Sequence, residues 1–284
     1  ENVDFAWSWR NVTISNTLIA EGLSNAGHSK GEHSKGLLVW NEYSPNSTLT
    51  LYRNAFITNK NRNPQTNNND GSQILDAVNN VTYNYGEGYV MGTLSNDAKA
   101  NWRHNYAKSG PISLPASWEI YVAKPAASNP WHYVVGNIGI SRAVQGGDEW
   151  TVGVDHTGTQ QDTAYRALTP WETKGLVATT MSEAHANSII ASVGATVPIT
   201  DSADQKVKDD YTNGTGALID SVTYPAGFPT YSTTNDNPLD TDQDGMVDAW
   251  ETLNGFNINV DDSAGDADGD GYTNIEEFFH DLAT

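Results

Sequence analysis

Ala77-Val78-Asn79-Asn80-Val81-Thr82-Tyr83 is the stretch that decides the fold of this chain. It is a short strand-like run of β-branched and aromatic residues with an asparagine pair at its centre. Comparable runs are Val12-Thr13-Ile14-Ser15, Leu49-Thr50-Leu51-Tyr52 and Trp131-His132-Tyr133-Val134-Val135. Such runs recur from residue 1 to about residue 145 with almost no helical periodicity, so this region is predicted to be all-β.

An asparagine recurs in or just after these runs, at Asn16, Asn54, Asn80, Asn105 and Asn137. The intervals are 38, 26, 25 and 32 residues. A period near 25 with insertions predicts the coils of a right-handed parallel β-helix. In that architecture the asparagines would stack at one turn, and their side chains would hydrogen-bond to the backbone of the coils above and below. The alternative is a generic Asn-rich β protein.

The remaining chain differs in composition. Residues 182–194 are predicted to form a helix with a Ser N-cap and a Gly stop, and residues 204–211 a second helix. Residues 225–238 are rich in Pro, Gly, Thr and Asn, which is typical of a linker. The predicted domains are an N-terminally incomplete β-helix (1–150), an extension whose helices pack on it (151–232) and an acidic tail (236–284).

Composition narrows the class of protein. The chain has 284 residues, no cysteine and a formal net charge of −20, so disulfides and thiolate metal sites are excluded. No apolar run approaches the roughly 18 residues that span a bilayer, which predicts a soluble protein. The charge argues against nucleic-acid or anionic-membrane partners. The chain opens on Glu1-Asn2-Val3-Asp4 with no initiator Met or visible signal peptide, so we expect a fragment or a processed product.

Most of the negative charge lies in the tail, which carries 14 acids and no Lys or Arg from Asp236 onward. Residues 240–251 and 266–277 both match the twelve-residue EF-hand-type calcium loop, with acids at positions 1, 3 and 5 and Gly at position 6. A structural Ca²⁺ clip is favoured over a signalling switch, with a dockerin-like attachment module as the competitor. The predicted Ca²⁺ ligands are Asp240, Asp242, Asp244, Met246 (carbonyl), Asp248, Glu251, Asp266, Asp268, Asp270, Tyr272 (carbonyl), Asn274 and Glu277.

Two short segments concentrate the scarce positive charge. The first holds His28, Lys30, His33 and Lys35 between two glycines that frame a turn, so its lysines need not be buried. The second, residues 59–64, reads Asn-Lys-Asn-Arg-Asn-Pro. On a β-helix these segments would lie on neighbouring coils and could share one groove; the alternative is a pair of solvated loops. The spacing of the two histidines does not favour a metal site.

At these residues the sequence resembles the bacterial pectate lyases of polysaccharide lyase family 1, over most of the chain. The most specific parts are the His-Ser-Lys segment and the Arg-Asn-Pro segment. The tail also looks like tails found on some of these lyases. The similar segments are residues 11–14, 19–23, 27–36, 51–56, 62–64, 78–86 and 103–106, with a weaker similarity at 214–216.

The resemblance implies a secreted (extracellular or periplasmic), monomeric enzyme that cleaves polygalacturonate by Ca²⁺-dependent β-elimination. It implies Arg62 as the base and Lys35 as a carboxylate-binding residue, with Lys30, His28 and His33 beside the substrate. It also implies Asp4 as one acid of a Ca²⁺ pair, or Glu1 in another register.

The sequence departs from the family after Pro64, where Gln65 stands near the position of a second Arg. Two other functions therefore stay open: a non-catalytic pectin-binding β-helix with a calcium tail, and a lyase for another uronate polymer.

Overall fold

The computed structural model describes most of the chain. The described residues are 2–40, 47–66, 73–87, 89–93, 99–114, 118–122, 131–143, 145–151, 153–155, 165–196, 200–222 and 238–282. The chain divides into two compact units, residues 1–196 with 200–228, and residues 197–199 with 229–284. Each unit is described by itself below. The predicted linker, 225–238, lies outside the described residues except for Pro238.

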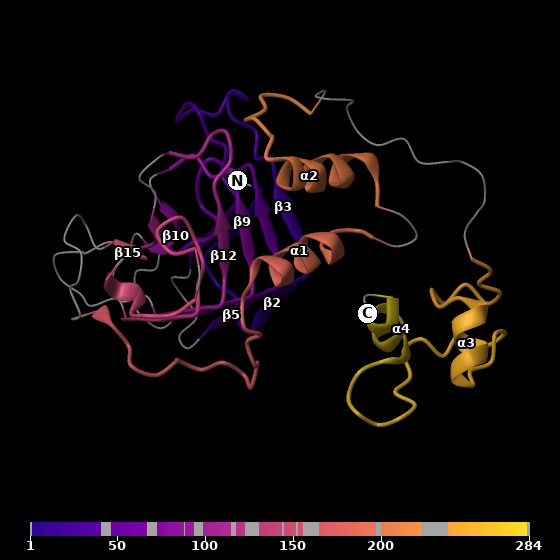
Figure 1. Cartoon of the computed structure of the whole chain (residues 1–284). Coiled ribbons are helices and arrows are strands. Elements are labelled where there is room, and N and C mark those ends of the chain that lie inside the picture. The colour runs from indigo at the N-terminus through magenta and orange to yellow at the C-terminus, as the bar shows by residue number, and fades with distance from the viewer. Residues whose placement is uncertain are drawn as a thin grey trace. The chain divides into compact units, whose positions relative to one another are not determined.

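The first unit is built from three sheets in which every strand pairing is parallel (Figure 1). Sheet A holds β1 (Val3–Phe5), β4 (Leu37–Val39), β7 (Gln65–Thr66), β10 (Tyr89–Thr93), β13 (Trp118–Val122) and β15 (Val154–Asp155). Sheet B holds β2 (Val12–Ser15), β5 (Thr48–Tyr52), β8 (Ile74–Val78), β11 (Lys99–Arg103) and β14 (Trp131–Val135). Sheet C holds β3 (Leu18–Ala20), β6 (Ala55–Ile57), β9 (Val81–Tyr83) and β12 (Tyr106–Lys108).

The chain visits the sheets in a fixed rotation. From β1 to β14 each strand of sheet A is followed by one of sheet B, and sheet C follows B in the four coils β2–β3, β5–β6, β8–β9 and β11–β12. Each coil therefore stacks on the one before it, which is the architecture of a parallel β-helix. The prediction of a parallel β-helix is confirmed, and its right-handedness stays a prediction.

The core lies inside the coils. Leu51, Ala77 and Trp102 are fully buried and belong to consecutive strands of sheet B. Leu37 and Val39 point into the same core from sheet A, and Phe56 from sheet C. Because side chains alternate across a strand, the residues between them face outward and are free to carry function.

The asparagine ladder forms at the turn between sheets B and C. The side-chain oxygen of Asn80 accepts from the backbone N–H of Asn54 at 3.0 Å, and that of Asn105 accepts from the N–H of Asn80 at 2.9 Å. Asn137 continues the ladder, because its side-chain oxygen accepts from the backbone N–H of Asn105 at 2.9 Å. The backbone N–H of Asn137 donates to the buried carboxylate of Glu149. An ion pair with Arg142 neutralises this carboxylate.

The predicted place of Asn16 in this ladder is wrong. The N–H of Thr17, not of Asn16, donates to the Asn54 side chain. Asn16 has a left-handed backbone (φ 49°), like Arg53, Asn79 and His104 in the coils below it. It therefore belongs to the preceding position of the turn, which needs a positive φ that asparagine tolerates better than most residues. The sequence interval could not separate two adjacent asparagine positions.

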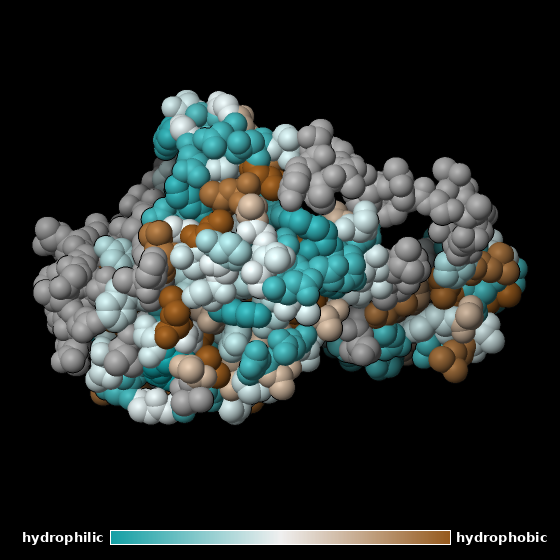
Figure 2. Space-filling view, turned by 45° about the horizontal axis from the view of Figure 1, so that its top comes forward, coloured by the Kyte–Doolittle hydropathy of each residue, from teal (hydrophilic) through white to brown (hydrophobic). Residues whose placement is uncertain are grey.

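Two helices cover the outer face of sheet C (Figure 1). Helix α1 (Glu183–Ser192) begins at the predicted N-cap, since Ser182 Oγ accepts from the N–H of His185, and Gly194 follows its end with a φ of 77°. Helix α2 (Ser202–Asn213) has Asp201 as its N-cap and Gly214 as its C-cap. Both helices pack apolar side chains against the outward residues of sheet C, including Ile57 and Tyr83. Hydrophilic side chains dominate the face seen in Figure 2, and hydrophobic ones form small separate groups.

The second unit contains two short helices, α3 (Asp248–Asn254) and α4 (Asn274–Leu282), each of which begins near the end of a predicted calcium loop. Trp250 stacks on Phe256 with ring centroids 5.4 Å apart and meets Phe278 edge-on. This aromatic contact joins the two helices. Within the described residues, no helix has the length and apolarity that crossing a bilayer requires.

Candidate functional site

The loops that lead into β4 and β7 lie side by side on neighbouring coils. Lys35 forms a β-bridge with Asn61, and its Nζ donates to Asn61 Oδ1 at 3.1 Å. Asn61 Nδ2 in turn donates to Glu87 Oε1 on the next coil at 3.1 Å. The β-helix thus aligns Lys35, Asn61 and Glu87, and we call these three residues with Arg62 the Lys35 site.

The backbone of Arg62 is fixed tightly next to Lys35. Arg62 has a left-handed backbone (φ 61°), and its carbonyl accepts from the N–H of Leu37 at 2.6 Å. A Cβ on Gly36 would lie 2.5 Å from the Arg62 carbonyl oxygen, so only glycine fits there. The two sequence segments that carry the resemblance therefore touch through Gly36 and Arg62.

Sequence reasoning missed the buried residue beneath this site. Asn59 is fully buried, and its side chain accepts from the N–H of Gly22 at 3.0 Å and donates to the Ile19 carbonyl at 2.9 Å. It also donates to Asn63 Oδ1 at 3.2 Å, on the residue after Arg62. The sequence does carry a sign of this buried residue, because Asn59 is a second asparagine, five residues after Asn54 and at the turn that follows β6.

The two lysines of the turn differ in burial. Lys30 is exposed, but Lys35 is half-buried, and burial lowers its pKa, with Lys60 and Lys30 adding repulsion and Glu87 opposing them. The sequence left open whether the lysines of this turn are buried, and Lys35 is half-buried in the structure. The reason is the stacking of coils, which places Lys35 over Asn61.

The two histidines of the turn lie on each other. The rings of His28 and His33 stack with centroids 3.7 Å apart and an interplanar angle of 9°. Burial, followed by repulsion from His28 and Lys35, lowers the pKa of His33 to about 4. His33 is therefore neutral at pH 7 and can offer a hydrogen bond there but no charge. The pair lines a cavity of about 410 Å³ next to Asn2 and Ser24.

Asp4 lies on the outer face of sheet A. It is exposed and pairs in register with Leu38, which pairs with Gln65. Residues in register on parallel strands point to the same side, so Asp4, Leu38 and Gln65 form one outward row. Gln65 is nearly fully buried within this row. The candidate ligand Glu1 lies outside the described residues.

The first calcium loop gathers carboxylates around a common centre. One oxygen of each of Asp240, Asp242 and Asp244 accepts a backbone N–H of the loop, from Gly245, Asp244 and Met246 respectively. The other oxygen of each is buried and has no hydrogen-bond partner. Ligand atoms from the three lie within 4.8 Å of one another. Buried oxygens without donors are costly unless a cation neutralises them, so the arrangement fits Ca²⁺.

Glu251 completes the centre from helix α3. It is fully buried, and neither carboxylate oxygen has a hydrogen-bond partner. Burial and the adjacent carboxylates of Asp242 and Asp244 raise its pKa to about 7. A side chain held in this way without a cation would be strongly destabilising.

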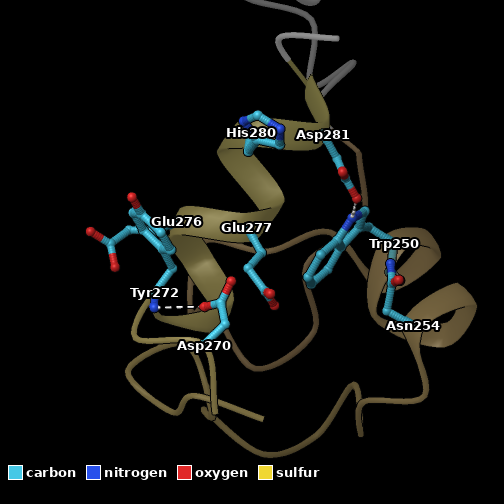
Figure 3. A pocket seen from close by; sticks show the side chains of 8 residues that line it. All are labelled: Trp250, Asn254, Asp270, Tyr272, Glu276, Glu277, His280 and Asp281. Carbon is cyan, nitrogen blue, oxygen red and sulfur yellow. Dashed lines mark hydrogen bonds between the residues drawn. The ribbon is translucent and has the colours of Figure 1, made fainter. Parts of the chain in front are cut away.

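The second loop is more open. Asp266, Asp268 and Asp270 also bring ligand atoms within 4.8 Å, but all three are exposed. Both oxygens of Asp266 already accept backbone N–H groups, from Gly269 and Gly271. In Figure 3, Asp270 accepts from the N–H of Tyr272, and Glu277 points from α4 toward the space beside Trp250. This space is a pocket of about 390 Å³ lined also by His280 and Asp281.

Two predicted ligands of the tail have other partners. The carboxylate of Asp248 accepts from both the N–H and the hydroxyl of Thr241, each at 2.7 Å. The side chain of Asn274 accepts from the N–H of Ala267 at 3.1 Å and donates to the Asp262 carbonyl at 2.7 Å. Sequence reasoning missed Asp262, whose ligand atom lies with those of Asp244 and Glu251. No signal marked it, because it falls outside both twelve-residue loops.

Fold and site together define a parallel β-helix with a basic cluster in the loops before β4 and β7, and a second unit with clustered acidic side chains. Several fungal proteins are similar to this chain in sequence. The chain is 29% identical to "Probable pectate lyase C" of Aspergillus terreus over 284 residues, and 31% identical to the protein of the same name from Aspergillus flavus over 281 residues. The counterpart from Neosartorya fischeri is 28% identical over 278 residues.

These alignments cover 96% of this chain and 60% of each relative. The chain therefore spans about three fifths of the length of these relatives. They are fungal, whereas the resemblance pointed to bacterial enzymes, and that origin stays a prediction. No family model matches the chain.

Proposed function

We propose that this chain is part of a secreted, calcium-dependent pectate lyase that cleaves polygalacturonate by β-elimination. The observation that carries the proposal is the Lys35 site, in which two segments 27 residues apart in sequence, at Lys35 and Arg62, are brought onto adjacent coils. The similarity to proteins named pectate lyase C extends over this region and supports the same function.

The proposed chemistry needs a base, an anion-binding group and a neutralising cation. The base removes the C5 proton alpha to the uronate carboxylate, and the released electron pair forms the C4–C5 double bond. The C4–O bond breaks, and the leaving glycosidic oxygen keeps its electron pair and takes up a proton from water. Arg62 is the proposed base, and its backbone is fixed by the Leu37 N–H. Lys35 is the proposed carboxylate-binding group, held in place by Asn61. Ca²⁺ between Asp4 and the uronate would neutralise the carboxylate and so acidify the C5 proton.

The donor type at Asp4 fits this role, because an exposed carboxylate is the ligand that Ca²⁺ prefers. Lys30, His28 and His33 are the proposed substrate contacts on the adjacent turn. The partly desolvated position of Lys35 strengthens its attraction to an anion compared with an exposed lysine.

The test is the ultraviolet absorbance of unsaturated products released from polygalacturonate by the full-length protein. We expect Arg62→Ala to lower kcat by about 10²- to 10⁴-fold and Lys35→Ala mainly to raise KM. Lys174→Ala is the matched control, because Lys174 is exposed and interacts with Glu172 on a different segment.

Unchanged activity in Arg62→Ala would contradict the assignment of the base. Binding of pectate without turnover by the full-length protein would instead select a non-catalytic β-helix. Turnover of another uronate polymer but not of pectate would select a different lyase, a possibility that Gln65 keeps open.

We propose that the tail (residues 238–282) binds two Ca²⁺ ions and needs them to fold. The support is the set of buried carboxylate oxygens without donors in the first loop, together with the short helices that follow each loop. Helices of 7 and 9 residues are too short to be stable alone in water. A calcium-driven rise in helical circular dichroism, reversed by chelator, tests the proposal; a chelator-insensitive signal would contradict it.

A further inference from the structure

The first calcium loop is closed by a residue from outside it. Ligand atoms of Asp244, Glu251 and Asp262 lie within 4.8 Å of one another. Glu251 is fully buried, and its two oxygens lack hydrogen-bond partners. Asp262 Oδ1 is also buried and without a partner. Three side chains from the loop, from α3 and from the segment after α3 thus aim oxygens at one point.

The acid at the ninth position of this loop has hydrogen-bond partners within the loop. Asp248 occupies the ninth position, but both of its oxygens accept from Thr241, at 2.7 Å each. Asp248 therefore holds the loop backbone, whereas a ligand atom of Asp262 lies with those of Asp244 and Glu251.

Asp262 is held in place by the second loop. Its carbonyl accepts from the side chain of Asn274 at 2.7 Å and from the N–H of Gly265 at 2.8 Å. The N–H of Ile275 donates to the carbonyl of Ser263 at 3.1 Å. Asn274 and Ile275 begin helix α4, so the second loop and α4 position the backbone of the residue that enters the first site.

We propose that Asp262 is a direct ligand of the divalent cation in the first loop, so that the tail holds one composite site and one open site that bind cooperatively. The first site has carboxylates from Asp240, Asp242, Asp244, Glu251 and Asp262, an all-oxygen set suited to a hard cation such as Ca²⁺. Occupancy of the second site orders Asn274 and so delivers Asp262. This inference rests on the proposed calcium tail.

The experiment is a calcium titration of the full chain followed by NMR. The amide of Gly245 donates to Asp240 and that of Gly271 donates to Asp266, so the two amides report the two sites separately. We expect Asp262→Asn to weaken Ca²⁺ binding at Gly245 at least about tenfold. Asp248→Asn is expected to change it less than about threefold.

Asp261→Asn is the matched control, since Asp261 is adjacent and exposed, accepts a hydrogen bond from the Ser263 hydroxyl, and undergoes the identical charge change. The double variant Asp268→Asn, Asp270→Asn empties the second site and is expected to weaken the first one as well. The amide of Gly265 shows whether the Asp262 segment stays folded in each variant. If Asp262→Asn unfolds it, Asp262→Glu keeps the charge and is expected to retain part of the affinity.

The inference would be overturned if the Gly245 amide reported the same Ca²⁺ affinity in the wild type and in Asp262→Asn, with a large loss of affinity in Asp248→Asn. The tail would then hold two ordinary loops. Equal losses in Asp262→Asn and Asp261→Asn would also overturn the inference, because the effect would then be one of general charge. No calcium-dependent shift at either glycine in the wild type would contradict the calcium tail itself.

Discussion

Asn80 shows what a single residue contributes to the β-helix. Its side chain accepts from the N–H and the side chain of Asn54 and donates to the Leu51 carbonyl and to Asn105. All these groups are buried, so none can exchange its partner for water.

We expect Asn80→Ala to lower the free energy of unfolding by about 3 kcal/mol, because removal of one partner leaves several buried donors and acceptors unsatisfied. Denaturant unfolding measures the change. Asn213→Ala, at the exposed end of α2 in the same unit, is the control. A loss as small as that of the control would mean that the ladder is not a main source of stability.

The second residue-scale prediction concerns pH. His33 has a pKa of about 4 in the fold, against 6.5 ordinarily. Between these values the unfolded chain binds a proton that the folded one does not, so stability is full above about pH 6.5 and falls as pH falls toward 4. We expect the free energy of unfolding of the His33→Gln variant to vary less with pH between these two values.

NMR titration of the His33 ring gives the direct check. A titration midpoint of His33 near 6.5 would contradict the stacked, partly buried geometry.

At the scale of elements, helices α1 and α2 close the outer face of sheet C. Ile189 is fully buried between α1 and this sheet. We expect Ile189→Ala to cost about 2–5 kcal/mol in unfolding free energy, since it opens a cavity that rigid strands cannot fill. Exposed Ser188 on the same helix is the control position. A cost below about 1 kcal/mol would show that the helices are loosely attached.

Sequence patterns identified these elements unequally. Ser182 as N-cap and the Gly after α1 are local signals, so the helix was predictable. The ladder asparagines Asn54, Asn80, Asn105 and Asn137 were also predictable. The position in the first coil was not, because Asn16 and Thr17 differ by one residue and only strand register separates them. Asp262 was not predictable for the same reason: its role depends on where α4 places the chain.

For the whole molecule, the two compact units differ in what stabilises them. The first buries a continuous apolar core, whereas the second has a small aromatic contact and clustered carboxylates that would be destabilising without a cation. We expect calorimetry to show a calcium-sensitive transition for the tail that rises with Ca²⁺, by about 2.7 kcal/mol of stabilisation at 100 times Kd. The β-helix transition should shift much less.

Variants of the tail show which calorimetric transition belongs to which unit. Asp240→Asn with Asp242→Asn should abolish the calcium-sensitive transition, while Asn80→Ala should move only the other one. A single transition that shifts as a unit in every variant would show that the two units unfold together.

The sequence by itself determined the parallel β-helix, helix α1 and the two acidic loops. The β-helix is visible as a recurrence near 25 residues along the chain, and the other two as spacing within about a dozen residues. Only the tertiary structure decided that Lys35 is half-buried over Asn61, that Gly36 abuts Arg62, and that Asp262 joins Glu251. The physical reason is that these contacts join residues of different coils or loops. Their distances are set by the stacking of elements, which local sequence does not encode.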